Sequence, residues 1–303
     1  NHRCGGVIAN FTMMFLKPEW ANNPAFFTGT ALVGIGTANA QFEDFDFNMQ
    51  FVPKFALGYM GSGGVGVRTT WWGFAESASR DSAVIAISAL PLLSAITNET
   101  FNDGATVIGP LQTRGHLNMN VWDNEVIYAM DAGKWDFLLG AGIRYAHIAQ
   151  RYDAVVRNAT TGAIVDTLLS GHNFNGAGPT LGLEVKRELG DGGFYTLANV
   201  RGSLLFGTRK NSAGTVGTNV QVIVGTAGNR VADSNAVFIP VGEIELGVGY
   251  QRSMGRARLI AEASLIAQSW WNAGNSSRSD FIFATTNEAL GLFGFGLKLG
   301  VTY

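Results

Sequence analysis

Hydrophobic and polar residues alternate with a period of two along much of this 303-residue chain. In the last eleven residues, 293–303, every second residue is phenylalanine, leucine, valine or tyrosine, and the residues between them are glycine, lysine or threonine. The same alternation recurs at residues 45–59, 135–145, 244–250 and 259–265. A period of two over such lengths predicts long β-strands, each with one apolar face and one polar face.

About ten strands are predicted, near residues 6–17, 45–60, 64–77, 115–130, 134–150, 176–188, 193–209, 236–252, 256–271 and 290–303. Twelve is the alternative, if the apolar stretch at residues 84–90 pairs with its neighbours. An even number of antiparallel strands returns both chain ends to the same side. We expect the last strand to pair with the first and thereby close the sheet, because an unpaired edge in lipid leaves backbone groups unsatisfied.

The connections between these strands are alternately short and long. Tight glycine-rich turns are expected at residues 61–64, 131–134, 190–193 and 253–255, and long segments at 18–43, 79–113, 153–172, 210–236 and 272–289. Short periplasmic turns and long outer loops are typical of outer-membrane β-barrels.

Alternation alone also fits a soluble β-sandwich, which would bury the apolar faces. Strand length favours a membrane barrel, because about ten residues per strand are needed to cross a bilayer at a tilt. Aromatic residues near the strand ends are consistent with two interfacial girdles, although ordinary core aromatics are the alternative. The residues assigned to these girdles are Tyr59, Trp135, Tyr195 and Tyr303 at one end and Trp71, Trp72, Trp270 and Trp271 at the other.

The sequence therefore predicts an all-β fold, a transmembrane antiparallel up-and-down β-barrel formed by residues 1–303 as one domain in the bacterial outer membrane. The chain opens without the charged and apolar regions of a secretory signal, so we expect a signal to have been removed. The longest apolar run, residues 84–96, is interrupted by Pro91 and is too short for a transmembrane helix.

Charged residues between the apolar rows are expected to point into the barrel, because a lipid-facing cation costs about 2–4 kcal/mol at the bilayer midplane. The predicted pore-lining residues are Lys54, Arg68, Glu76, Arg144, Glu184, Lys186, Arg201, Glu243, Glu245, Arg258, Glu262 and Lys298. We expect Glu243 and Glu245 to lie near Arg258 and Glu262, with Lys298 on the strand beyond. Such charges either line a narrow water-filled path or pair across a lumen little wider than its own side chains.

Charge, cysteine and histidine content exclude several other classes of function. The 21 Lys and Arg residues nearly balance 23 Asp and Glu, which argues against a nucleic-acid partner. Cys4 alone cannot form an intrachain disulfide and is expected to be a free or intermolecular thiol. The neighbouring Ser170, His172 and Asn173 do not by themselves make a catalytic triad, which is built from separated segments. No metal-ligand spacing or phosphate-binding loop is present, so we expect neither a cofactor nor an enzyme.

Five stretches carry a resemblance to a known family: GAGIRYAHIAQRYDA (140–154), FNGAGPTLGLEVKREL (174–189), FYTLANVRGSLLFGTRK (194–210), PVGEIELGVGYQRSM (240–254) and ARLIAEASLIAQSWWN (257–272). They resemble, in this order, the Legionella-type pore-forming major outer-membrane protein family. The resemblance covers roughly the C-terminal half. It implies a pore-forming envelope protein and carries no catalytic residues across.

The leading hypothesis from the sequence is a pore-forming, porin-like protein that lets small polar solutes or ions diffuse through a narrow charged lumen. The alternative is a structural barrel with a closed lumen that packs into oligomers. Residues 30–35, 84–96 and 216–224 are apolar for outer loops. Because exposed apolar patches usually mark interfaces or are folded away, these segments predict that the loops extend the wall, enter its mouth, bind an apolar ligand or join copies in a homo-oligomer or array.

Overall fold

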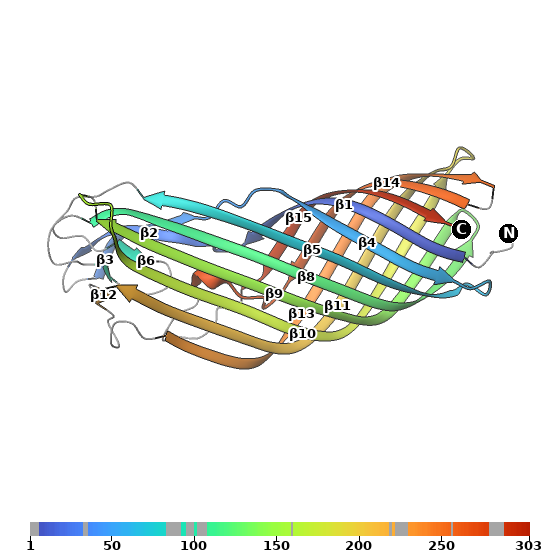
Figure 1. The fold of residues 1–303 in the computed structure, drawn as a ribbon. Coiled ribbons are helices and arrows are strands. Elements are labelled where there is room, and N and C mark those ends of the chain that lie inside the picture. Colours follow the sequence, from blue (N-terminus) through green and yellow to red (C-terminus); the bar gives the residue numbers. More distant parts are fainter. Residues whose placement is uncertain are drawn as a thin grey trace.

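The computed structural model describes residues 6–32, 36–82, 92–94, 100–101, 108–158, 160–217, 220–221, 230–255, 257–278 and 288–303. Ten of the described strands close an antiparallel barrel in the order β1-β15-β14-β13-β11-β10-β9-β8-β5-β4 (Figure 1). These strands are β1 (Gly6–Trp20), β4 (Gln50–Met60), β5 (Val65–Ser82), β8 (Ile108–Ala132), β9 (Trp135–Asn158), β10 (Ile164–Leu189), β11 (Phe194–Gly217), β13 (Arg230–Met254), β14 (Ala257–Trp270) and β15 (Leu290–Thr302). The predicted ten-strand barrel is confirmed.

A smaller five-stranded sheet lies at the end of the barrel away from the chain termini (Figure 1). Its members are β2 (Pro24–Leu32), β3 (Gly36–Asp44), β6 (Leu92–Ser94), β7 (Thr100–Phe101) and β12 (Val220–Gln221). A short 3-10 helix, η1 (Ser276–Arg278), lies between β14 and β15. Across the described residues, no helix is both long enough and apolar enough to cross a membrane.

The barrel is closed by pairing between its first and last strands. Phe11 of β1 lies opposite Leu299 of β15, and the ladder continues from Ile8↔Thr302 to Trp20↔Leu290. On its other edge β1 pairs with β4, where Phe11 lies opposite Phe55. Pairing on both edges satisfies the backbone N–H and C=O groups that lipid cannot satisfy.

Glycine sets the geometry of the short turns at the end of the barrel that holds both termini, here called the turn end. Gly64, Gly133, Gly190, Gly193 and Gly255 all have positive φ, between 63° and 80°. This left-handed conformation carries little steric cost only for glycine. The glycine-rich turns predicted from the sequence therefore connect β4 to β5, β8 to β9, β10 to β11 and β13 to β14.

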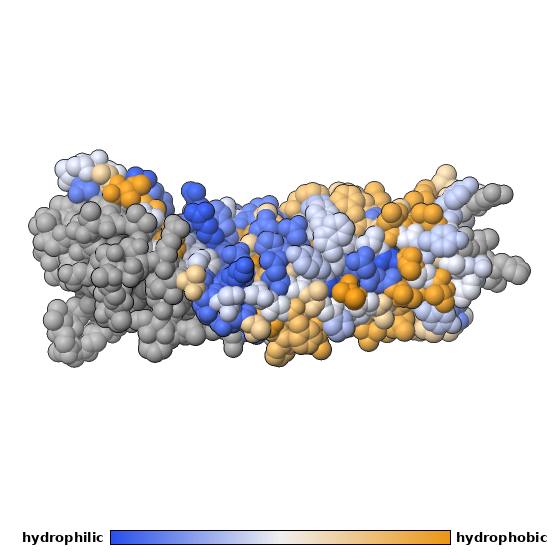
Figure 2. Space-filling model, turned by 60° about the horizontal axis from the view of Figure 1, so that its bottom comes forward, coloured by the Kyte–Doolittle hydropathy of each residue, from blue (hydrophilic) through white to orange (hydrophobic). Residues whose placement is uncertain are grey.

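Outward-facing apolar side chains form a belt around the half of the barrel nearest the turn end. The belt comprises the outward residues within 7–15, 51–59, 65–73, 122–130, 135–145, 177–189, 194–206, 238–250, 259–271 and 293–303. Each strand contributes roughly the ten residues that a tilted transmembrane strand needs. Figure 2 shows hydrophobic residues gathering toward the turn end and hydrophilic residues covering the middle of the barrel.

Beyond the belt, the central strands continue toward the opposite end, here called the mouth end. Residues 153–172 and 210–236 were expected to be loops, but β9, β10, β11 and β13 occupy most of both stretches. The expectation was wrong because the antiparallel ladder persists past the belt, for example at Leu168↔Ala154 and Asn173↔Lys210.

Two further expectations concern the segments before and after β4. The strand predicted to begin at residue 45 begins at Gln50, and Phe45 and Phe47 are buried instead of sharing the outward face of Phe51. The stretch that would have raised the strand count to twelve, residues 84–90, lies outside the described residues, as does Cys4. The side chains of the apolar segments 30–35, 84–96 and 216–224 also lie outside the described part of the chain.

The position of the belt makes a stability prediction. Leu297 faces outward near the middle of β15, so Leu297→Arg should lower the free energy of unfolding by about 2–4 kcal/mol, measured by urea titration of protein inserted in lipid vesicles. Tyr303→Arg, at the belt's edge, is the matched control and should cost about 0–1 kcal/mol. Equal losses for both variants would contradict the placement of the belt.

Candidate functional site: the barrel interior

Charged side chains from non-neighbouring strands meet inside the belt. Arg68 of β5 contacts Glu125 of β8 (Nη2–Oε2, 3.1 Å) and Glu184 of β10 (Nη1–Oε1, 2.6 Å). Arg201 of β11 contacts the same Glu125 (Nη1–Oε1, 2.5 Å). Because β5 does not adjoin β10, and β8 does not adjoin β11, the Arg68–Glu184 and Arg201–Glu125 pairs reach across the lumen, whereas Arg68 and Glu125 lie on neighbouring strands.

Arg144 of β9 is the centre of a second group of ion pairs. Its guanidinium donates two hydrogen bonds to Asp123 of the neighbouring β8, at 2.7 and 2.9 Å, and a third to Glu243 of β13. The arginine side chain is only 1% exposed. A bidentate pair with a second carboxylate compensates the charge that burial takes out of water.

Glu262 of β14 is the centre of a third group. Its Oε1 accepts hydrogen bonds from the Lys186 ammonium and the Tyr195 hydroxyl, both at 2.7 Å, and its Oε2 lies 2.8 Å from the Lys298 ammonium. These partners come from β10, β11 and β15. Together the three groups join side chains from eight of the ten barrel strands inside the belt.

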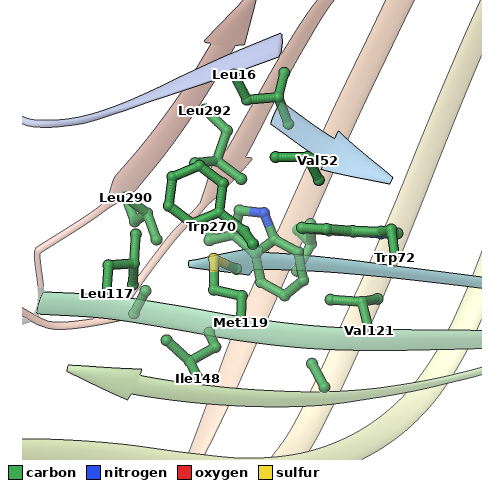
Figure 3. Close-up of a cluster of buried hydrophobic side chains, with 14 of the residues drawn as sticks. Leu16, Val52, Trp72, Leu117, Met119, Val121, Ile148, Trp270, Leu290 and Leu292 are labelled. Atoms are coloured by element: carbon green, nitrogen blue, oxygen red, sulfur yellow. The ribbon is translucent and has the colours of Figure 1, made fainter. Parts of the chain in front are cut away.

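A layer of buried hydrophobic side chains lies on the mouth side of these charges. All ten barrel strands contribute to it. Its members are Met14, Leu16, Val52, Trp72, Phe74, Leu117, Met119, Val121, Ala146, Ile148, Phe174, Leu205, Ile239, Val241, Ile266, Trp270, Leu290 and Leu292, together with Ala273. Trp72 and Trp270 meet edge to face with ring centroids 6.1 Å apart, and Figure 3 shows Trp270 surrounded by side chains of the layer.

A cation–π contact joins the charged and hydrophobic layers. The Arg144 guanidinium carbon lies 5.8 Å from the centroid of the Trp270 ring. Every member of the layer is at most 5% exposed. The interior therefore contains two stacked zones, paired charges toward the turn end and close-packed hydrophobic side chains toward the mouth.

The segment 272–278, between β14 and β15, folds into the mouth above the hydrophobic layer and is here called the mouth segment. Gln150 donates to the Gly274 carbonyl (3.2 Å) and accepts from the Ser276 amide (3.1 Å). The Arg209 guanidinium donates to the Asn272 carbonyl at 2.5 Å. Asn272 and Gly274 both have positive φ, which lets the chain turn inward at this point.

Most predicted pore-lining residues do point into the barrel. Nine of them are in the contacts just described or, for Glu245, accept a hydrogen bond from Ser264 (2.6 Å). Lys54 and Glu76 are half-buried on inward positions, and Glu76 accepts a hydrogen bond from Gln50.

The expected charge cluster around Glu243 needs correction. Arg258 is exposed at the turn end of β14 and does not face Glu243, which pairs with Arg144 instead. Only Glu262 and Lys298 of the expected set contact each other. Arg258 is next to the turn, where an inward position on the strand is still open to water.

The assignment of the aromatic girdles was partly wrong. Tyr59, Trp135, Trp271 and Tyr303 are exposed and Trp71 is half-buried on an outward position, but Tyr195, Trp72 and Trp270 are buried inside the barrel. Neighbouring residues of a strand point to opposite faces, so two adjacent tryptophans cannot both face lipid. Phe194 is 59% exposed, which places Tyr195 on the inner face.

Asp123 and Glu125 are interior charges that the sequence interpretation missed. The signal was present, because Trp122, Val126 and Tyr128 share one parity on β8 and are exposed, so the carboxylates between them face inward. Asparagines on the outward face of the same strand weaken the alternation of apolar and polar residues, and the inward direction of the two carboxylates is therefore harder to recognise from the sequence.

Other reactive groups offer no assembled catalytic or metal site among the described residues. Ser170 and His172 point inward, whereas Asn173 lies on the opposite face of β10. Within the described part of the chain, no three His, Cys, Asp or Glu side chains are grouped to hold a metal ion.

Comparisons with known structures support the fold. The outer membrane protease OmpT from Escherichia coli aligns over 98% of this chain and 96% of its own, with a TM-score of 0.50 and 12% identity. The Pseudomonas putida toluene transporter TodX (TM-score 0.27, 6% identity, 99% and 89% covered) and a Pseudomonas aeruginosa FadL homologue (0.24, 10%, 99% and 89%) are more distant. At 12% identity the likeness to OmpT shows the fold alone.

No curated protein sequence matches the chain. The family profile described as the Legionella pneumophila major outer membrane protein precursor matches residues 9–303, which includes every strand of the barrel except the start of β1. The family match and the outer-membrane barrel fold together place the protein in the bacterial outer membrane, and the chain belongs to the Legionella major outer membrane protein family.

Proposed function

We propose that the protein is a structural outer-membrane barrel whose lumen is closed in its resting state. The observation that carries this proposal is the hydrophobic layer, to which all ten barrel strands contribute buried side chains. A water-filled path would have to pass between Trp72, Trp270 and their neighbours. Hydrophobic constrictions exclude ions because water does not wet them.

The paired charges below the layer support the same proposal. An open path with selective charge would leave carboxylates or ammonium groups facing water, whereas Glu125 and Asp123 each contact an arginine and their side chains are at most 4% exposed. A ring of about ten strands has an interior only slightly wider than the side chains that fill it. Pairing across the lumen therefore stabilises the barrel more than it selects ions.

The proposal predicts that the wild-type protein does not conduct ions in planar bilayers. Purified wild-type protein should show no stepwise openings, whereas Trp72→Ala/Trp270→Ala should conduct because it removes the two largest side chains of the layer. Trp71→Ala/Trp271→Ala, which changes the outward neighbours, is the matched control and should stay silent. Regular stepwise openings by the wild-type protein would overturn a closed resting state.

A gated pore for small polar solutes or ions is the second candidate, as the family resemblance implies. The observation that favours it is the mouth segment, whose contacts with Gln150 and Arg209 are hydrogen bonds from a loop and not part of the strand ladder. In addition, the side chains of Glu184, Lys186 and Lys298 remain 17–23% exposed toward the turn end. Displacement of this segment together with Trp270 would open the mouth.

The gated pore makes a different electrical prediction. Gln150→Ala should loosen the mouth segment and give wild-type-sized openings at a higher frequency. Adding Glu243→Gln and Glu245→Gln should then shift ion preference toward anions, measured as the reversal potential in a salt gradient. Silence of Gln150→Ala, or unchanged selectivity in a conducting triple variant, would contradict the gated pore.

The buried arginine network makes a stability prediction that a water-filled lumen does not share. Arg144→Met should lower the free energy of unfolding by about 3–5 kcal/mol, because Glu243 loses its hydrogen-bonded partner and Asp123 keeps only Arg201, at 4.0 Å. Asp123→Asn/Arg144→Met/Glu243→Gln should recover most of that loss in urea titrations. Lys17→Gln, which removes an exposed pair with Asp46, is the control and should leave stability unchanged.

Self-association stays a prediction of the sequence. The apolar segments 84–96 and 216–224 that suggest it are outside the part of the chain whose side chains the structure describes. A homo-oligomer or array is compatible with either candidate function, because neither uses the outer surface.

A further inference from the structure

An open hollow of about 720 Å³ lies across β5, β8, β9, β10 and β11, between the apolar belt and the mouth end. Cross-strand pairing places Ser77, His116, Arg151, Gly171 and Ser212 in one row across these five strands. Alternation puts this row on the outer surface, because the next residues along the same strands, such as Leu117 beside His116 and Gln150 beside Arg151, are buried inside. The hollow is therefore on the outside of the barrel wall.

Small residues create the hollow between longer polar side chains. Ala75, Ala149 and Gly171 have little or no side chain, and a Cβ on Gly171 would approach the Ser212 hydroxyl to 2.9 Å. Asn118 and Asn173 add carboxamides beside the serine hydroxyls. Hydroxyl and amide groups around an open depression are suited to hydrogen-bonding sugar hydroxyls.

Positive charge surrounds the same hollow. Arg151 is in its lining, Lys210 lies opposite the lining residue Asn173, and Arg114 is two residues from His116. All three cations are exposed. Asp153 is the acidic neighbour, at 2.7 Å from Arg151 and 3.7 Å from His116. Asp81, four residues beyond Ser77 on the same face of β5, is a second carboxylate and is exposed. Three permanent cations against two carboxylates leave a net positive surface.

The height of the hollow above the belt indicates which layer of the membrane lies beside it. On β9 the outward belt ends at Tyr145, and Arg151 follows six residues later. At ~3.3 Å per residue and a strand tilt of ~40°, Arg151 lies about 15 Å beyond the belt. In an outer membrane this is above the acyl chains, at the level of large lipid headgroups.

We propose that this hollow binds the phosphorylated saccharide headgroup of an outer-leaflet glycolipid, with Arg114, Arg151 and Lys210 contacting phosphate and Asn118, Asn173 and Ser212 contacting sugar. Arginine binds phosphate oxygens in a bidentate geometry and lysine acts as a point charge. The proposal depends on the location of the barrel in the membrane and not on whether its lumen opens.

The binding test uses the refolded full-length protein in nonionic detergent, titrated with purified lipopolysaccharide that carries a phosphorylated core. Binding is measured by microscale thermophoresis, with the same lipopolysaccharide after enzymatic dephosphorylation and with inorganic phosphate as two further probes. Arg114→Gln/Arg151→Gln/Lys210→Gln should raise the dissociation constant at least tenfold, and dephosphorylation should have a similar effect. Added salt should weaken wild-type binding, because screening reduces the attraction between exposed charges.

Two further variants separate shape from charge. Ala149→Phe fills the hollow without changing charge and should also weaken binding, whereas Asp153→Asn removes the acidic neighbour and should strengthen it. Lys17→Gln, a cation on the outward face of β1 outside this group of strands, is the matched control and should bind like the wild type.

Wild-type affinity in the triple variant would overturn the proposal, as would equal affinity for the dephosphorylated lipid. Competition by inorganic phosphate at concentrations equal to those of the lipid would also overturn it, because the hollow would then be a small-anion site. A folded barrel is verified for each variant by its heat-dependent shift on gels, so that loss of binding reflects the hollow itself.

Discussion

The structure depends on one constraint, that every backbone N–H and C=O group within lipid must find a partner inside the protein. Pairing of β1 with β15 meets this constraint by leaving no free edge in the ring. Once the ladder is continuous, each residue's face is fixed by its parity along the strand. The apolar belt, the interior charges and the outer wall beyond the belt are three consequences of that single alternation.

The size of the ring decides what the inward faces can do. Ten strands enclose a space that side chains can span, so charges on strands three positions apart in the ring reach one another. Arg68 meets Glu184, and Arg144 meets Glu243, across the lumen. Where the inward residues are hydrophobic, the same narrowness lets Trp72 and Trp270 touch. Charged and hydrophobic zones thus follow each other along the barrel axis.

The strands extend beyond the bilayer because the ladder remains satisfied there without lipid. The extension supplies a rigid wall that supports the mouth segment on its inner side, through Gln150 and Arg209. On its outer side the same strands carry polar and cationic groups above the apolar belt. Along these strands, alternate residues therefore either hold the mouth segment inside the barrel or form the polar and cationic outer surface.

The sequence by itself determined the strands, the turns and most faces, since period-two alternation and glycine turns are local signals. It predicted Glu262 and Lys298 as inward residues on neighbouring strands, and those two residues are in contact. Only the tertiary structure decided that Arg144 pairs with Asp123 and Glu243 and that a hydrophobic layer crosses the lumen. These contacts depend on strand register and on which side chains meet across the lumen, and no local pattern encodes either.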